Sequence, residues 1–153
     1  MEFTQQVARH LREFYYGPNM PGINFSDTIN GVGLELATKK IGEHNSILAL
    51  VFHIDYYVDG ITKVLEGGEL TIRDKFSFDH PLVETEEEWT NFVARVMANG
   101  DRFARRIAEL DDEKLADGFV KTEYGTHYRN LVGCTEHLYY HLGQIALLKK
   151  LLS

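Results

Sequence analysis

Two histidines near the C-terminus, His137 and His141, have the spacing of a metal site. On an α-helix, residues four apart lie about 40° apart around the axis, so both imidazoles share one face and can reach one ion. A third histidine, His53, lies in another segment of strong helical character, residues 47–57. Three imidazoles from two helices suit a divalent transition metal ion and leave at least one coordination position open, as in catalytic sites. The sequence therefore predicts a metal site at His53, His137 and His141.

Four long helices are expected to position these histidines, because apolar residues recur every three to four positions in four segments. These segments cover about residues 4–16, 45–65, 85–110 and 128–152. No segment shows a convincing strand pattern. The predicted fold class is all-α: an antiparallel four-helix bundle with two long connections, formed by residues 1–153 as a single domain.

Signals at the ends of the first two helices support these boundaries. Gly17 and Pro18 should end the first helix, since glycine favours a left-handed cap and proline cannot continue the hydrogen-bond ladder. Asn45 is a suitable N-cap for the second helix. The long connection between them should contain a short helix at about residues 26–29.

The third helix begins with a capping box, in which Thr85 and Glu88 satisfy each other's backbone N–H groups. Its apolar stripe stays in phase across Gly100, so we expect one continuous helix that tolerates the glycine at about 1 kcal/mol relative to alanine. In the connection before this helix, Phe76 and Phe78 are expected to fold back onto the bundle.

Composition restricts the class of protein. The chain has 16 Lys and Arg against 23 Asp and Glu, a formal charge of −7, which argues against nucleic-acid binding because that requires a basic face. The longest apolar run, residues 47–52, is too short to span a bilayer. Cys134 is the single cysteine, which fits a reducing compartment, and no secretory signal is visible. We expect a cytoplasmic protein that binds neither nucleic acid nor membrane.

The order of these features resembles the DinB/YfiT-like superfamily of metal-dependent four-helix-bundle proteins. The resemblance extends over nearly the whole chain. It rests on His53 within the second long helix, Trp89 at the start of the third, and the segment 137–144 with its two histidines, followed by a leucine-rich end.

The resemblance implies both a site and a type of activity. In that superfamily, one histidine of the second helix and two of the last form a metal-binding triad, which falls here on His53, His137 and His141. The superfamily includes transferases and isomerases that use low-molecular-weight thiols, and some members form dimers. The resemblance thus implies a homodimeric, metal-dependent enzyme of the transferase or hydrolase type, with a small-molecule substrate such as a low-molecular-weight thiol.

Imidazole ligands suit zinc, nickel, copper and iron, of which we expect zinc or nickel. Three neutral imidazoles leave the ion its full charge, so it would lower the pKa of a coordinated water or thiol. The competing hypothesis is a non-catalytic dimeric bundle that binds a metal or a small ligand. A carboxylate within hydrogen-bond reach of the metal would favour catalysis.

Several other residues allow two interpretations. Cys134 lies three positions before His137 and could be a fourth ligand, although a small buried apolar residue is the simpler interpretation. Arg129 could receive an anionic substrate or form a surface salt bridge. Asp55, Glu136 and Gln144 are candidates to accept hydrogen bonds from the second nitrogens of the triad. The remaining histidines are expected on the surface or in loops: His10, His44, His80 and His127.

Overall fold

The computed structural model describes residues 2–153, whose secondary structure is helical, with no strand and one isolated bridge between Gly118 and Thr126. The four long helices are α1 (Phe3–Tyr16), α4 (Ile47–Leu65), α5 (Glu86–Ala108) and α6 (His127–Leu152). Two short helices, α2 (Phe25–Ile29) and α3 (Leu34–Thr38), lie between α1 and α4. The all-α prediction is confirmed, as are the four long segments to within about two residues of their expected ends. The helix α3 was not predicted.

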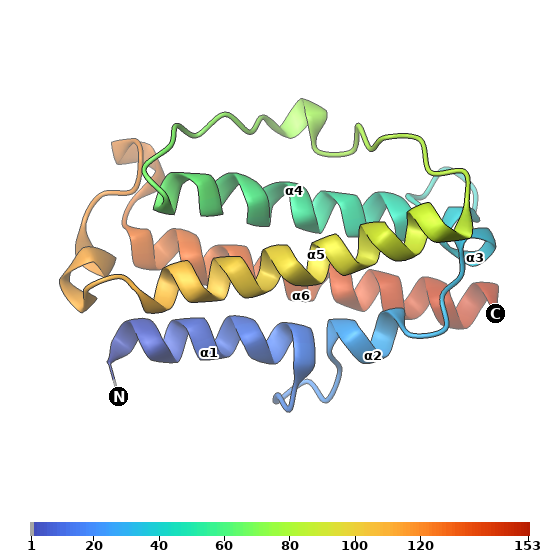
Figure 1. The fold of residues 1–153 in the computed structure, drawn as a ribbon, viewed down its shortest axis with the longest axis horizontal. Helices are drawn as coiled ribbons and strands as arrows, with labels where there is room; N and C mark the ends of the chain where they lie inside the picture. Colours follow the sequence, from blue (N-terminus) through green and yellow to red (C-terminus); the bar gives the residue numbers. More distant parts are fainter. Residues whose placement is uncertain (1) are drawn as a thin grey trace.

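The four long helices lie side by side (Figure 1), with α5 contacting α1 and α4, and α6 contacting the same two helices. Helices α1 and α6 run in one direction, and α4 and α5 in the other. The parallel course of α4 and α5 requires a connection that returns along the whole length of α4. Residues 66–85 form this connection, which includes the short 3-10 helix η1 (Asp74–Phe76).

Local sequence explains the helix ends. Gly17 follows α1 with a φ of 64°, the left-handed conformation that glycine adopts readily. The expected capping box is present at the start of α5: the Thr85 hydroxyl accepts the backbone N–H of Glu88, and the Glu88 carboxylate accepts the backbone N–H of Thr85. The N-cap of α4 is Ser46 and not Asn45, since the Ser46 hydroxyl accepts the Ala49 N–H at 3.2 Å. A serine adjacent to the asparagine offers the same capping chemistry, so sequence alone could not choose between them.

Gly100 lies where α5 meets α1. A Cβ atom at this position would lie 2.3 Å from Cζ of Tyr15, whose side chain is almost fully buried. The glycine therefore lets α5 pass directly over the Tyr15 ring. The expected helical cost of the glycine is offset by this close packing.

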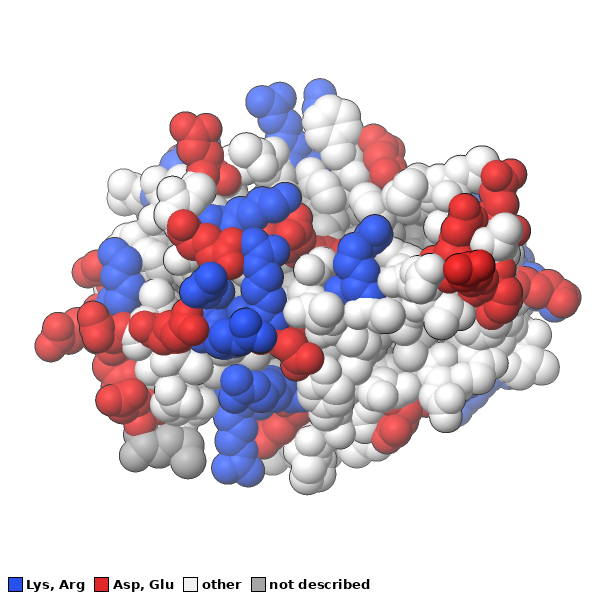
Figure 2. Space-filling model, viewed as in Figure 1, with Lys and Arg blue, Asp and Glu red and all other residues white. Residues whose placement is uncertain are grey.

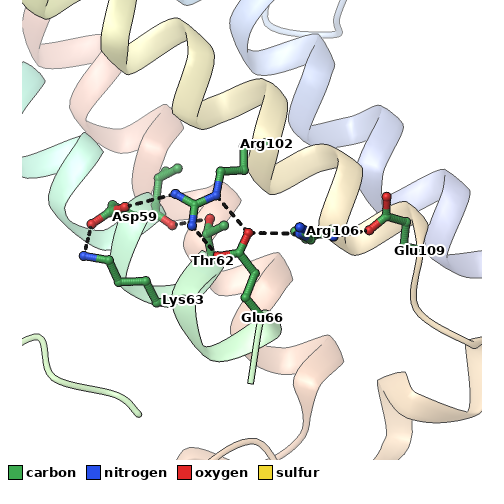
Figure 3. A network of polar contacts seen from close by, with 8 residues as sticks. Asp59, Thr62, Lys63, Glu66, Arg102, Arg106 and Glu109 are labelled. Atoms are coloured by element: carbon green, nitrogen blue, oxygen red, sulfur yellow. Dashed lines mark hydrogen bonds and ion pairs between the residues drawn. The ribbon is translucent and has the colours of Figure 1, made fainter. Parts of the chain in front are cut away.

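The far end of α4 is joined to α5 by a network of ion pairs (Figure 3). Glu66 accepts hydrogen bonds from both Arg102 and Arg106, and Asp59 pairs with Lys63 at 2.6 Å. The two guanidinium groups lower the pKa of Glu66 to about 2. These side chains are between 23% and 53% exposed, so solvent screens the ion pairs and the network orients the helix end more than it stabilises the fold.

Acidic and basic side chains are interspersed on the face shown in Figure 2. Within residues 2–153, none of the helices combines the length and the apolar character needed to cross a bilayer.

Candidate metal centre

The structure brings His53, His137 and His141 together, as the sequence predicts. His53 lies in the middle of α4, and the other two lie one turn apart on α6. Nε2 of His137 is 3.0 Å from Nε2 of His53 and 2.9 Å from Nε2 of His141. His53 and His141 are only 6% and 7% exposed, and His137 is half-buried between them. Three ring nitrogens thus converge on one point between two helices.

The outer nitrogens of the cluster are held by hydrogen bonds. Nδ1 of His53 donates to the backbone carbonyl of Ser77 at 3.2 Å, and Nδ1 of His141 donates to Oε1 of Gln144 at 2.7 Å. Because both partners are acceptors, the ring proton of each histidine resides on Nδ1, and the lone pair of Nε2 faces the centre. This is the tautomer that a metal ligand needs.

The environment favours neutral imidazoles. Burial lowers the pKa of all three histidines, and the proximity of the rings to one another lowers the pKa of His53 and His137 further. The shift is largest for His137, whose pKa falls to about 4. All three are therefore uncharged at neutral pH, when their lone pairs are available to a metal ion.

Aromatic side chains enclose the cluster. Phe78 stacks on His53 with 4.0 Å between ring centroids and 9° between ring planes, so the connection folds back onto the bundle at this residue as predicted. Phe76, for which the same was predicted, is 44% exposed. The Tyr57 ring lies edge-on to both His53 and His137, at 5.0 and 4.9 Å. Its hydroxyl donates to Oδ1 of Asp74 at 2.6 Å. Asp74 is thus the carboxylate that the connection brings to the edge of the site.

The donor set fits a divalent transition metal ion. Two imidazole nitrogens bound to one ion at about 2.0–2.1 Å lie about 2.8–3.4 Å apart for bond angles between 90° and tetrahedral. The two separations in the structure, 3.0 and 2.9 Å, lie in the lower part of this range. The nitrogens of His53, His137 and His141 that could bind an ion all lie within 4.8 Å of one another. The triad could therefore close on an ion with small movements of the rings.

Of the three candidate acceptors around the triad, only Gln144 has that role. Asp55 is buried, but it accepts a hydrogen bond from Asn99 at 2.9 Å. Glu136 is exposed on the outer face of α6. The acceptor for His53 is a backbone carbonyl, that of Ser77, which lies 24 residues away in the connection. A carbonyl carries no signal in the sequence, so this contact could not be predicted.

Cys134 is not part of the cluster. Its thiol is buried, and burial raises its pKa to about 12, so it is a neutral, small apolar side chain. This supports the simpler of its two readings. Arg129 is exposed near the start of α6.

The histidines expected on the surface divide into two groups. His10, His44 and His80 are exposed, as predicted. The prediction for His127 was wrong: it is 6% exposed, with Nδ1 donating to the carbonyl of Asp117 at 3.2 Å. The reason is the turn before α6, which places the Phe119 ring edge-on to this imidazole at 5.3 Å.

Comparisons with known proteins were made for the whole chain. None of the protein-family models, curated proteins or solved structures compared with the chain matches it.

Proposed function

We propose that this protein binds one divalent transition metal ion, zinc or nickel, through Nε2 of His53, His137 and His141. The observation that carries the proposal is the convergence of three ring nitrogens, two of them with their lone pairs fixed toward the centre by Ser77 and Gln144. Neutral imidazoles that donate their ring N–H groups away from the centre and turn their lone pairs toward it form a suitable site for a cation.

We further propose that the protein is a metal-dependent enzyme of the transferase or hydrolase type, acting on a small molecule such as a low-molecular-weight thiol. When bound, a divalent ion held by neutral imidazoles would lower the pKa of a coordinated water or thiol. The chain's own residues would orient and shield this centre. Ser77 and Gln144 hold two of the rings, Phe78 covers one of them, and Asp74 fixes the hydroxyl of Tyr57 at the edge.

We infer that the four long helices form a DinB/YfiT-like four-helix bundle, in which α1 and α5, and likewise α4 and α6, are antiparallel neighbours, while α4 and α5 run parallel. The two long connections predicted are residues 17–46 and 66–85, and residues 109–126, with the 3-10 helices η2 (Asp112–Ala116) and η3 (Thr122–Tyr124), form a third. We also propose a homodimer located in the cytoplasm, where a single free cysteine such as Cys134 would remain reduced.

Metal analysis of protein purified without a nickel column tests the metal site. We expect one equivalent of zinc or nickel per chain, and loss of stoichiometric binding in His137→Ala with the helical circular dichroism retained, because apolar packing holds the fold. His80→Ala is the matched control, since His80 is exposed outside the cluster and should not alter binding. Full occupancy in His137→Ala would show that the triad is wrongly assigned.

Activity is tested separately with the metal-loaded protein. A screen of electrophilic and ester substrates with low-molecular-weight thiols should reveal turnover that is lost in His137→Ala. Stoichiometric metal binding without turnover in this screen would instead favour the non-catalytic metal-binding bundle.

A further inference from the structure

A second site lies beside the triad, at the end of the bundle where α4 begins and α6 ends (Figure 1). It is a cavity of about 340 Å³, within the usual size range of small-molecule pockets. Its apolar wall comes mainly from leucines of the two helices, Leu50, Leu147, Leu148 and Leu151. Leu147 and Leu151 are 57% and 62% exposed, so the wall leaves apolar surface in contact with water.

Each polar side chain that lines this cavity carries at least one hydrogen-bond donor. Besides the apolar side chains, His44, Asn45 and Gln144 line it, and no carboxylate does. Oε1 of Gln144 is occupied by His141, which leaves the amide nitrogen with two N–H groups. Within residues 2–153, the hydrogen bond found for this nitrogen is a long one of 3.3 Å to the Tyr140 hydroxyl. Donors are therefore free to bind an acceptor in the cavity.

The charge around the polar end also favours an anion. Asn45 immediately precedes Ser46, the N-cap of α4, a helix of 19 residues. The N-terminus of such a helix carries a partial positive charge on the side of Asn45, whereas the opposite partial charge at the end of α6 is offset by Lys149 and Lys150 in its last turn. An apolar wall with donors and a positive helix end beside it is complementary to a molecule with a hydrocarbon body and a negative head.

We propose that this cavity binds a small aliphatic carboxylate. Its alkyl chain lies against Leu147 and Leu151, and its carboxylate accepts hydrogen bonds from His44, Asn45 and Gln144. The site requires no metal ion, so it is independent of the proposed function. Gln144 nevertheless belongs to both sites, because the same side chain that faces the cavity also holds His141.

Isothermal titration calorimetry with octanoate, on the full chain treated with a chelator, tests this proposal. We expect saturable binding of one octanoate per chain. Leu151→Asp should weaken binding at least tenfold, because it places a negative charge in the apolar wall. The matched control is Leu82→Asp, the same change at a leucine that is 78% exposed and lies outside this cavity, which should leave binding unchanged within twofold.

The head group is tested with octan-1-ol, which has the same chain length but no charge. His44→Ala should weaken octanoate at least threefold and leave octan-1-ol unchanged. Equal affinity of the wild type for both ligands would overturn the carboxylate assignment. Absence of saturable octanoate binding would overturn the site, as would equal binding by Leu151→Asp and Leu82→Asp. If the wild type binds no octanoate but forms a dimer that Leu151→Asp dissociates, a second copy of the chain covers this surface instead of a carboxylate. Because the protein is metal-free, none of these results depends on the triad.

Discussion

Zinc binding should persist when the pH is lowered from 7 to 5. A histidine ligand must be neutral to bind, so protons and metal compete for the same lone pair. Exposed histidine sites lose this competition as the pH falls through the ordinary imidazole pKa. In the triad, burial lowers the pKa of His53, His137 and His141 below that value. The neutral form should therefore survive into mildly acidic solution.

The size of the effect follows from the pKa of His137. With the ordinary value of 6.5, about 3% of an imidazole is neutral at pH 5, which would cost each ligand about thirtyfold in metal affinity. With a pKa of about 4, roughly 90% of His137 is neutral at pH 5, and its affinity loss is negligible. Three ordinary histidines would together lose roughly four orders of magnitude.

Equilibrium dialysis against buffered zinc at pH 7, 6 and 5 measures the dissociation constant directly. We expect it to rise by clearly less than the four orders of magnitude that three ordinary histidines would lose, because all three pKa values are lowered and His137 contributes almost nothing to the loss. A rise of four orders of magnitude would refute the argument from burial.

The same lowered pKa values have an opposite consequence for the metal-free fold. Below about pH 6.5 the unfolded chain binds protons that the folded triad does not, so the free energy of unfolding decreases as the pH is lowered. The loss ends near pH 4, where the folded His137 also becomes protonated. His137 alone contributes at most about 3 kcal/mol, less after allowance for its partial exposure. Urea unfolding of metal-free protein at pH 7 and 4.5 should show a smaller fall in His137→Gln than in the wild type; an equal fall would contradict the assignment.

Three further predictions concern packing, the ligand environment and assembly. Gly100→Ala should lower the free energy of unfolding in urea by about 1–3 kcal/mol, because its Cβ would meet the Tyr15 ring. Gly143→Ala, on an exposed turn of α6 where a Cβ would have no atom within 4 Å, should raise it by about 0.5–1 kcal/mol; a rise in both variants would show that α5 does not need the glycine for close approach. Gln144→Leu should weaken zinc binding about 10–100-fold by equilibrium dialysis while the fold is retained, and unchanged affinity would show that the His141 hydrogen bond is dispensable. Light scattering at micromolar concentration should give twice the chain mass, and a mass of 17.6 kDa alone would exclude the dimer.

The long helices could be predicted because their signals are local. Periodic apolar residues define the buried stripes, and the capping box of Thr85 and Glu88 fixes where α5 begins. Helix α3 could not be predicted in the same way, because it has only five residues and its N-cap, Gly33, has no side chain to cap it, whereas the equally short α2 is capped by Asn24. Its position depends on tertiary contacts, such as the hydrogen bond from the Leu34 N–H to Glu86 across 52 residues.

The triad could be predicted because its geometry is also largely local. The four-residue spacing of His137 and His141 defines one face of α6, and His53 lies on the inward stripe of a helix that packs against it. The contacts that complete the site depend on how the connection 66–85 folds. Stacking of Phe78 on His53 and the carbonyl of Ser77 both come from this segment, which has no periodic pattern of its own. Sequence reasoning suggested that Phe78 returns to the bundle, but not what it would contact.

The hydrogen-bonding capacity of the cluster is the physical basis of the proposed cation site. His53 and His141 use their ring protons outward, so at the centre they offer only lone pairs. His137 can offer one N–H at most, and it faces both neighbours within 3.0 Å. At least one lone pair in a mostly buried site is therefore left without a donor, which is unfavourable. A further proton on the cluster would supply the missing donor for this lone pair. Burial and the neighbouring rings, however, lower the pKa of His137 too far for such protonation at neutral pH. A divalent metal ion accepts all three lone pairs at once, and apolar residues flanking the triad, Ile54, Leu138 and Leu142, hold the two helices in place for it whether or not the ion is bound.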